Sequence, residues 1–323
     1  MRPQAPDDAS SRRDVCVVGE LNPDLILYGL PKDPKPDHEY LVDGFRLTLG
    51  SSSAIFAHNL AALGTRVGMI SKIGADALGE MCLGWLRSAK VDLSCVVKSK
   101  RNMTTGLSVI LAHPGHRYIL TYPGTIFDLA HEDLDLEYVF AARHLHVASY
   151  YLNRALRPRM ASLFREAKAH GLTTSLDTND DPAGTWGNDL LEVLPNVDIF
   201  LPNEREAKLI AHADDLTTAI DMLSKKVRTV VVKLGSAGAL SREGKNAWRC
   251  KPLDVSPVDT VGAGDSFDAG YIHQFLQGAE PQQCLDYANL AGAFSTTQEG
   301  GTEAFRNHEA LKRFLADHGA NRS

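Results

Sequence analysis

Short apolar runs recur along the chain and alternate with stretches whose apolar residues fall at helical spacing. The run Val15–Val18 ends at Gly19, and comparable runs lie at 67–70, 145–148, 172–176, 197–201 and 230–234. A run of four or five apolar residues is typical of a strand buried on both faces of a parallel sheet. Helical patterns lie between the runs, at 53–63, 154–170 and 220–226. The alternation therefore predicts an α/β fold with a mostly parallel central sheet.

Two segments, 25–49 and 104–123, break this alternation because no crossover helix follows either of them. In the second segment, apolar residues flank the polar sequence His-Pro-Gly-His at 113–116, which is the pattern of a hairpin. We expect the two segments to form a small separate sheet over the ends of the main one. The predicted organisation is a disordered tail at 1–13, a large α/β domain built from 14–24, 50–103 and 124–318, and a small β lid built from 25–49 and 104–123.

The composition is that of a folded protein with small ligands. Of the 323 residues, 44% are hydrophobic and 23% are charged, which provides enough apolar material for a buried sheet. The formal net charge is −6, and no run of Lys or Arg occurs. This balance argues against a nucleic-acid partner, because such binding depends on neutralising phosphates.

The cysteines and the amino end indicate a cytoplasmic protein. The five cysteines are scattered and never paired as Cys-x-x-Cys, which argues against a disulfide framework and a zinc site. The first 13 residues are polar and lack the apolar core of a signal peptide or a membrane anchor. We therefore expect no membrane partner.

The strongest local signal is the sequence DTVGAGDSFDAG at 259–270. Phe267, Tyr271 and Phe275 recur at intervals of four residues, which predicts a helix that begins at the glycines. The first turn of a helix has free N–H groups, and glycines let an anion approach them closely. A carboxylate at Asp265 would repel a bound phosphate, so acceptance of a proton from an attacking hydroxyl explains it better. The local alternative is a tight turn at Gly262 and Gly264 in which Asp265 or Ser266 only caps the helix.

Further motifs lie in order along the chain. They are GELNPD at 19–24, GSSSAIFAHN at 50–59, GADALG at 74–79, NERE at 203–206 and LGSAG at 234–238. Together with 259–270, they resemble the ribokinase-like, or PfkB, family of carbohydrate and nucleoside kinases over nearly the whole chain. The resemblance implies a three-layer α/β/α sandwich with a mostly parallel central sheet and a small β-sheet lid. It also implies transfer of the γ-phosphoryl group of ATP to a hydroxyl, with Mg²⁺ as cofactor.

The resemblance also assigns roles to single residues. Catalysis would rest on Asp265 as the general base and on Gly262, Ala263 and Gly264 as the anion hole. The substrate would contact Asn22, Asp24, Gly50, Ser51 and Asn179, and ATP would contact Asn203, Lys233, Gly235, Gly238 and Asn289. Glu206 would hold Mg²⁺ through water, and Asp259, Val261 and Gly300 are candidates for holding K⁺.

Several of these short motifs have a purely structural alternative. Asn203 and Glu206 also form the pattern of a capping box. Residues 22–24 are an ordinary turn sequence, and Lys233 could simply extend from a strand end. His144 and His146 alternate on a predicted strand, and we expect them to pack rather than bind a metal, because no third ligand has a convincing spacing.

Departures from the family pattern bear on the substrate. Where ribokinases usually carry GGKGAN, this chain has GSSSAI at 50–55, so Ile55 replaces an Asn. The segment DTNDD at 177–181 resembles the DxNxR element of fructokinase-like members, but Asp181 replaces the Arg that would grasp a carboxylate or phosphate. A small neutral sugar, ribose- or fructose-like, is therefore the predicted acceptor.

Alternatives remain open for the substrate and the assembly. Arg117 in the lid could supply the missing cation, so a sugar-acid kinase, a nucleoside kinase and a non-catalytic sugar or nucleotide sensor stay alternatives. Leu25, Ile26 and Leu27 could form an uncovered lid face that pairs with its copy in a homodimer, or could pack inside one chain.

Overall fold

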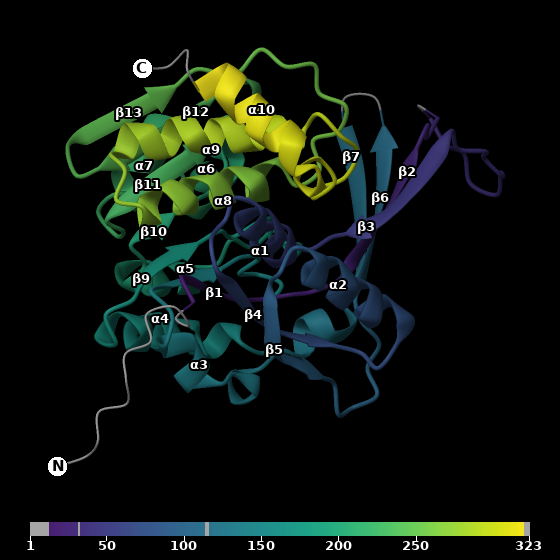
Figure 1. The fold of residues 1–323 in the computed structure, drawn as a ribbon, viewed down its shortest axis with the longest axis horizontal. Helices are drawn as coiled ribbons and strands as arrows, with labels where there is room; N and C mark the ends of the chain where they lie inside the picture. The colour runs from purple at the N-terminus through teal and green to yellow at the C-terminus, as the bar shows by residue number, and fades with distance from the viewer. Residues whose placement is uncertain (1–12, 32, 114–115, 320–323) are drawn as a thin grey trace.

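The structure is a computed structural model, and it describes residues 13–31, 33–113 and 116–319. Its core is a nine-stranded sheet in the order β13-β12-β11-β10-β9-β8-β1-β4-β5 (Figure 1). Neighbouring strands from β5 to β11 pair in parallel, and β12 and β13 add an antiparallel edge. The predicted tail at 1–13 lies, apart from Arg13, outside the described residues. The strands are β1 (Val15–Val18), β4 (Val67–Ile73), β5 (Asp92–Lys98), β8 (His144–Val147), β9 (Thr173–Leu176), β10 (Ile199–Phe200), β11 (Thr229–Lys233), β12 (Ala239–Glu243) and β13 (Asn246–Cys250).

Helices cover both faces of this sheet. One layer contains α1 (Ser52–Ala62), α2 (Ala77–Ser88), α8 (Ala263–Leu276) and α9 (Pro281–Ser295), with α10 (His308–Gly319) packed on α9. The other contains α3 (Leu136–Phe140), α4 (Met160–Ala169), α5 (Asp189–Val193), α6 (Glu204–Ile210) and α7 (Leu216–Leu223). Along β1, Val15 and Val17 face the first layer while Cys16 and Val18 face the second, because successive side chains of a strand point to opposite faces. The predicted three-layer sandwich is confirmed.

The sequence patterns place most elements correctly but miss some ends. The run at 197–201 yields only the two-residue strand β10. The helical pattern at 154–170 becomes α4 only from Met160, after a 3₁₀ turn at Arg157–Arg159, because Pro158 has no N–H to continue an α-helical ladder. Among the described helices, none is both long and apolar enough to cross a membrane.

The lid is a separate four-stranded sheet in the order β3-β2-β6-β7. Its strands are β2 (Pro23–Tyr28), β3 (Gly44–Leu49), β6 (Leu107–His113) and β7 (His116–Tyr122). Strands β6 and β7 pair antiparallel with Leu107 opposite Tyr122, which confirms the predicted strands of a hairpin. The tip of that hairpin, at 114–115, lies outside the described residues.

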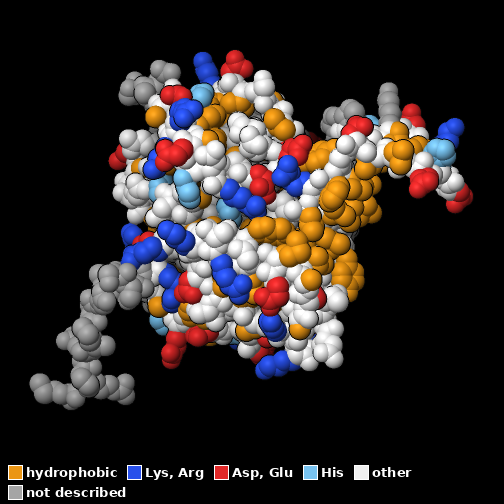
Figure 2. All heavy atoms as spheres, turned by 45° about the vertical axis from the view of Figure 1, so that its right-hand side comes forward, with side chains coloured by type: hydrophobic (Ala, Val, Ile, Leu, Met, Phe, Trp, Pro, Cys, Tyr) orange, Lys and Arg blue, Asp and Glu red, His pale blue; other side chains and the backbone are white. Residues whose placement is uncertain are grey.

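The two faces of the lid differ in polarity. On the inner face, Ile26 and Ile110 are buried and pack against Val261, just before α8. On the outer face, neighbouring strands place mostly apolar side chains opposite one another, and His113 follows at the end of β6. The apolar residues are Leu25, Leu27, Phe45, Leu47, Leu107, Val109, Leu111, Tyr118, Leu120 and Tyr122. Figure 2 shows hydrophobic side chains gathered over this sheet. Of the two alternatives for residues 25–27, packing inside the chain holds for Ile26, because strand alternation turns its side chain inward.

Close packing of α8 on α9 predicts opposite effects for two helical glycines. A Cβ on Gly270 would lie 2.7 Å from the Cβ of Ala291 and 3.0 Å from the Cα of Ala288, whereas a Cβ on Gly84 of α2 would meet nothing within 4 Å. We expect Gly270→Ala to lower the free energy of unfolding by about 1 to 3 kcal/mol. Gly84→Ala should raise it by roughly 0.5 to 1 kcal/mol. Urea unfolding measures both, and equal effects would contradict the packing described.

Candidate active site

A cavity of about 680 Å³ lies at the carboxyl ends of the parallel strands, beneath the lid. Open parallel sheets generally bind ligands at this edge. The predicted residues Asn22, Asp24, Ser51, Asn179, Asn203, Glu206, Lys233, Gly235, Val261, Gly262, Gly264 and Asp265 all line it. The other predicted residues lie outside this wall and are Gly50, Gly238, Asp259, Ala263, Asn289 and Gly300. The fold therefore brings most of the predicted site together.

The turn before α8 is built so that only glycine fits. Gly262 has φ 73°, and a Cβ there would lie 2.5 Å from the Cα of Gly301. Among the described residues, no side chain caps the first turn of α8, so the capping alternative for Asp265 fails. The N–H of Ala263 donates to the carbonyl of Thr260 at 3.3 Å, whereas Gly264 lines the cavity. This end of the helix can therefore face an anion.

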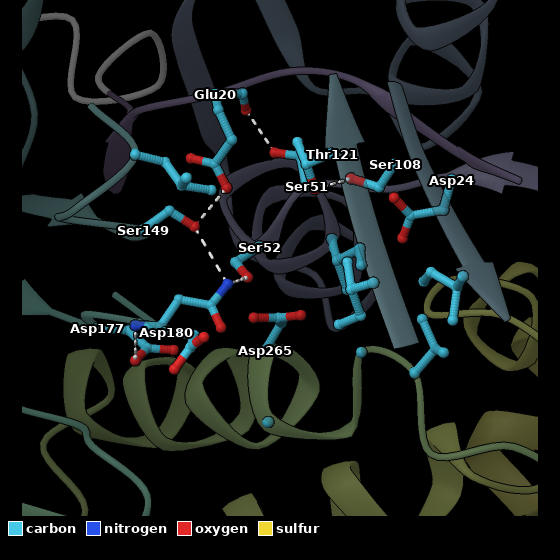
Figure 3. Close-up of a pocket in the computed structure, with 18 of the residues that line it drawn as sticks. Glu20, Asp24, Ser51, Ser52, Ser108, Thr121, Ser149, Asp177, Asp180 and Asp265 are labelled. Atoms are coloured by element: carbon cyan, nitrogen blue, oxygen red, sulfur yellow. Dashed lines mark hydrogen bonds between the residues drawn. The ribbon is translucent and has the colours of Figure 1, made fainter. Parts of the chain in front are cut away.

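Asp265 lies one turn into α8 with its carboxylate in the cavity (Figure 3). Burial raises the pKa of Asp265 to about 6, and the Asp177 carboxylate adds to the rise, while Lys233 and a hydrogen bond from Ser52 oppose it. A carboxylate with a pKa near 6 is still ionised at neutral pH and is a stronger base than an ordinary Asp. The arrangement can accept a proton at the mouth of an anion site.

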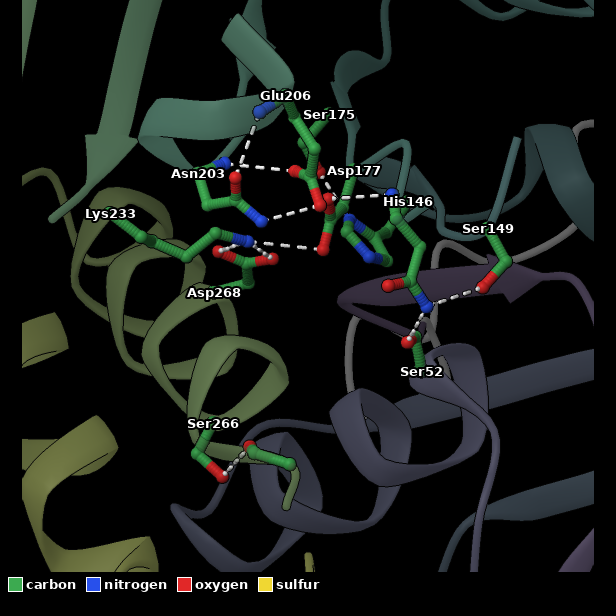
Figure 4. Close-up of polar contacts among 12 residues, drawn as sticks. Ser52, His146, Ser149, Ser175, Asp177, Asn203, Glu206, Lys233, Ser266 and Asp268 are labelled. Carbon is green, nitrogen blue, oxygen red and sulfur yellow. Dashed lines mark hydrogen bonds and ion pairs between the residues drawn. The ribbon is translucent and has the colours of Figure 1, made fainter. Parts of the chain in front are cut away.

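Behind Asp265, one ammonium group is surrounded by carboxylates (Figure 4). Nζ of Lys233 lies 3.1 Å from Asp177 and 3.0 Å from Asp268. Burial alone would lower the pKa of Lys233, but Asp177, Asp268 and Glu206 together raise it. Burial raises the pKa of Asp268 well above its ordinary value. Lys233 therefore does more than extend from a strand end, because it is the counter-ion of a buried acidic cluster.

Asn203 and Glu206 make the capping box of α6. The N–H of Glu206 donates to Asn203 Oδ1 at 2.9 Å, and the N–H of Asn203 donates to Glu206 Oε2 at 2.9 Å. Burial raises the pKa of Glu206 to about 7, with Asp177 adding to the rise. Crowded carboxylates favour a nearby cation. Among the described residues, however, no three His, Cys, Asp or Glu side chains are placed to hold a metal ion together, so contact of Glu206 with Mg²⁺ through water stays a prediction. The capping box is thus confirmed, and the functional role of the motif stays a prediction.

The residues considered for K⁺ are tied together by the carboxylate of Asp259. Oδ1 accepts from the N–H of Val261 at 2.9 Å, and Oδ2 accepts from the N–H of Gly300 at 3.0 Å. The hydroxyl of Tyr28, on lid strand β2, donates to the same Oδ2 at 3.1 Å. Asp259 therefore fastens the loop before α8 to the lid. The three hydrogen bonds use three of the roughly four lone-pair positions of this carboxylate, so binding of K⁺ beside Asp259 stays a prediction.

The outlying nucleotide residues have structural contacts. Gly238 has φ 89°, and a Cβ there would lie 2.1 Å from the carbonyl of Cys250, so the turn after β11 requires glycine. Nδ2 of Asn289 donates to the carbonyl of Lys251 at 2.8 Å and joins α9 to the segment after β13. His144 and His146 pack inside the sheet and both bond the Ser175 hydroxyl at 2.7 Å, as expected for structural histidines.

The substrate end of the cavity joins β2 to the start of α1. Nδ2 of Asn22 donates to the carbonyl of Pro23 at 3.0 Å and lies 3.4 Å from the Ser108 hydroxyl. A Cβ on Gly50 would meet the carboxylate of Asp24 at 2.0 Å, so Gly50 leaves room for that carboxylate. Burial raises the pKa of Asp24 to about 7, and the nearby Asp265 carboxylate adds to the rise.

Sequence reasoning missed part of the polar wall, which also contains Glu20, Ser52, Ser149, Asp177 and Asp180. Glu20 lies inside the GELNPD motif, and Asp177 opens the DTNDD segment, so their positions at strand ends were available as a signal. Ser149 carries no comparable signal. Its left-handed backbone, φ 51°, becomes visible only in the structure.

The comparison with known families agrees with this geometry. The model of the "pfkB family carbohydrate kinase" matches residues 12–307. The chain belongs to the PfkB family of carbohydrate kinases. The match covers the lid, the acidic cluster and the glycine turn of this kinase, so the resemblance seen in its motifs is confirmed.

Relatives of the kinase differ in substrate. It is 30% identical to an ATP-dependent ribose-1-phosphate kinase of Halopiger xanaduensis, over 94% of this chain and 98% of that one. It is 28% identical to a 5-dehydro-2-deoxygluconokinase of Clostridium perfringens, covering 95% and 94% of the two chains. A ribokinase II candidate of E. coli, crystallised with ATP and Mg²⁺, superimposes with a TM-score of 0.82 at 23% identity, covering 95% and 100%. That structure shares the fold.

The raised pKa of Asp24 predicts that this residue reduces stability at alkaline pH. A folded-state pKa near 7 lies above the ordinary value of 3.8, so ionisation is harder in the folded state. The resulting penalty is absent below about pH 4 and grows as the pH rises to about 7. We expect Asp24→Asn to raise the free energy of unfolding at pH 8 by at least about 1 kcal/mol and to change it little at pH 4.

Asp76 provides the control of opposite sign. Burial alone would raise the pKa of Asp76, but the N–H groups of Gly79 and Thr105 lower it below the ordinary value. The ionised Asp76 carboxylate therefore stabilises the folded protein at pH 8, and this stabilisation is lost as the pH falls. We expect Asp76→Asn to lower the free energy of unfolding at pH 8. Urea unfolding at pH 4 and pH 8 measures the difference in the free energy of unfolding between each of the two variants and the wild type. A destabilised Asp24→Asn variant at pH 8 would contradict the description of Asp24.

Proposed function

We propose that the chain transfers the γ-phosphoryl group of ATP to a hydroxyl of a small neutral sugar, ribose- or fructose-like, with Asp265 as general base. The observation that carries this proposal is the Asp265 carboxylate in the cavity beside the uncapped first turn of α8. A site that only senses a ligand needs contacts but no base, whereas phosphoryl transfer needs a proton acceptor beside an anion site.

The residues would divide the reaction between them. Asn22, Asp24, Ser51 and Asn179 orient the sugar so that one hydroxyl faces Asp265. The hydroxyl oxygen attacks the γ-phosphorus, its proton passes to Asp265, the bond to the β-phosphate oxygen breaks, and ADP leaves. The N–H of Gly264 and the ammonium of Lys233, which lies 3.7 Å from where a Cβ of Gly264 would stand, stabilise the charge on the transferred group. The lid excludes water, which would otherwise accept the phosphoryl group.

The nucleotide side would hold ATP and its metal. Asn203, Gly235 and Lys233 line the part of the wall that faces the phosphates in this proposal. Glu206 would bind Mg²⁺ through water beside Asp177, where the excess of carboxylates favours a divalent cation. Mg²⁺ would neutralise charge on the phosphates of the nucleotide. K⁺ would be held near Asp259, Val261 and Gly300, where the Asp259 carboxylate accepts the N–H groups of the other two residues.

The charges of the wall support a neutral sugar. At the substrate end, the carboxylates of Glu20, Asp24 and Asp265 face one cation, Arg117 of lid strand β7, whose Nη1 lies 3.4 Å from the Thr260 hydroxyl. A carboxylate or phosphate on the sugar would meet net repulsion there. Asp181 does not contribute, because its carboxylate lies away from the cavity wall and accepts N–H bonds from its own loop, including that of Trp186 at 2.8 Å.

Replacement of Asp265 tests the reaction directly. We expect Asp265→Asn to fold, to bind ATP and to lose at least about 10²-fold in turnover, since general-base catalysis contributes 10² to 10⁴-fold. ADP release measured across neutral sugars, nucleosides, sugar acids and sugar phosphates identifies the acceptor. Turnover of the variant near that of the wild type would remove Asp265 as the base. Tight sugar binding without any ADP release would favour a sensor.

We also propose that two copies pair through the outer face of the lid. Phe45 is 72% exposed, Leu120 57% and Tyr122 57%. Large, contiguous apolar surfaces mark interaction sites, and a face with ten apolar side chains on neighbouring strands can be covered by a second copy of itself. The earlier expectation of a homodimer through the lid thus rests on Leu25 and Leu27 rather than Ile26.

A charged residue introduced on the outer face of the lid should prevent two copies of the chain from pairing. We expect the wild type to sediment at about twice the 35.2 kDa mass of the chain, and Phe45→Asp to sediment as a monomer. Met222, an exposed apolar residue on α7, is 45% exposed and serves as the control, so Met222→Asp should leave the mass unchanged. A monomeric wild type over the micromolar range would overturn the dimer.

A further inference from the structure

A buried amide of α1 contacts both backbone segments that meet at the anion turn, residues 262–264. Nδ2 of Asn59 donates to the carbonyl of Gly301 at 2.9 Å and to the Ser266 hydroxyl at 2.9 Å. The Ser266 hydroxyl donates in turn to the carbonyl of Gly262 at 2.7 Å (Figure 4). Asn59 and Ser266 are fully buried, and neither lines the cavity. Asn59 therefore acts on a ligand only through the residues that it holds.

The carbonyl groups at the ends of this network fix the direction of its hydrogen bonds. A carbonyl oxygen only accepts, so the amide atom of Asn59 that faces Gly301 is the nitrogen. Oδ1 of Asn59 then accepts from Nδ1 of His58 at 2.8 Å. Burial lowers the pKa of His58 to about 4, so the ring is neutral near pH 7. Ser266 gives its one proton to Gly262 and accepts from Asn59, so both amide protons of Asn59 are used.

Ile55 adds an apolar contact on the same face of α1, because it lies four residues before Asn59. A Cβ on Gly301 would lie 2.6 Å from Cδ1 of Ile55. A Cβ on Gly262 would lie 3.2 Å from Cγ2 of Ile55 and 2.5 Å from the Cα of Gly301. The two glycines thus lie against each other, with Ile55 against both. Packing by Ile55 and hydrogen bonds from Asn59 hold the anion turn together.

The position of the Gly262 carbonyl also governs the peptide groups that follow it. This carbonyl accepts the hydroxyl of Ser266 at 2.7 Å and the N–H of Ser266 at 2.9 Å. The next carbonyl, that of Ala263, lies against α9, where a Cβ on Gly292 would be 3.1 Å from its oxygen. The C=O and N–H of a trans peptide point in opposite directions. The N–H of Gly264 is therefore turned away from α9, and Gly264 lines the cavity.

We propose that Asn59 is a positioning residue for phosphoryl transfer. Through Ser266 and Gly301, it holds the anion turn so that the N–H of Gly264 keeps its direction while negative charge develops on the transferred group. The inference rests on the proposed function for the role of Gly264. A donor whose direction is fixed in advance needs no reorganisation at the moment of reaction, so it stabilises the transition state more than the bound substrate. ADP lacks the transferred group, so its binding should depend little on Asn59.

The affinity for a mimic of the transferred group tests this positioning. Calorimetry gives the Kd of ADP with Mg²⁺, in the presence and absence of aluminium fluoride, which takes the place of the γ-phosphoryl group. Asn59→Leu keeps a branched side chain but removes both N–H donors. We expect this variant to bind ADP within about 2-fold of the wild type and to lose at least about 10-fold of the tightening that aluminium fluoride produces. Ser266→Ala should change the two affinities in the same way, and it provides a second route if Asn59→Leu fails to fold.

A rescue variant and a control complete the set. A threonine hydroxyl in a helix can donate to the carbonyl four residues before it, so Ser266→Thr keeps the bond to Gly262 and should keep the tightening. Ser162→Ala on α4 removes a hydroxyl that donates to the carbonyl of Arg159, and it should change neither affinity. Equal loss of tightening in Ser266→Ala and a folded Ser266→Thr would overturn the inference.

A merely structural role of Asn59 gives a different result. It would weaken ADP binding by the same factor with and without aluminium fluoride, or would change neither affinity in a folded variant, and both results would overturn the inference. The measurement needs no acceptor. If aluminium fluoride fails to tighten ADP binding by the wild type, the inference and the proposed function both fail. If the tightening depends on Asn59 but no sugar is phosphorylated, the proposed acceptor fails and the positioning role stands.

Steady-state kinetics with the acceptor sugar give a second readout. An interaction made mainly in the transition state affects kcat rather than KM. We expect Asn59→Leu to lower kcat at least about 10-fold with the KM for ATP nearly unchanged, since loss of one well-placed donor costs about 10² to 10³-fold in kcat. A raised KM with an unchanged kcat would contradict a positioning role at the anion turn.

Discussion

The site depends on holding many carboxylates close together with little water. Glu20, Asp24, Asp177, Glu206, Asp265 and Asp268 converge on the carboxyl edge of the sheet, and all of them except Asp265 are buried. The cation among them is Lys233, whose side chain is 13% exposed. Like charges at short range raise one another's pKa, and burial increases the effect. The fold tolerates this because Lys233, the N–H groups at the starts of α1 and α6, and serine hydroxyls distribute the charge.

The same crowding of carboxylates explains both the basicity of Asp265 and a loss of stability in the folded protein. An ordinary aspartate would be a weak base, whereas burial beside Asp177 moves the pKa of Asp265 to about 6. Asp24, with a pKa raised to about 7, reduces stability where the enzyme would work. The uncapped start of α8 gives up a stabilising contact in the same way. A ligand that brings hydrogen-bond donors or a cation to these carboxylates reduces their destabilising effect. Ligand binding should therefore stabilise the folded protein.

Prediction from the sequence was most successful where the local residue types and the spacing of apolar residues indicate the same element. The glycines before α8 and the spacing of Phe267, Tyr271 and Phe275 predicted an element that the structure contains in full. The sequence left the place of Ile26 open, because an apolar run of three does not reveal which side chain turns inward. Ser149 could not be found, because parts of the chain far apart in sequence bring it to the cavity and a serine gives no sign of a left-handed backbone.

A crystal structure with ADP, Mg²⁺, aluminium fluoride and the acceptor sugar would test the central claim most directly. The account predicts that the fluoride group lies against the N–H of Gly264, with the sugar hydroxyl between the aluminium and Asp265 and about 3 Å from its carboxylate. A fluoride group bound away from the start of α8, or a reacting hydroxyl out of hydrogen-bond reach of Asp265, would contradict it.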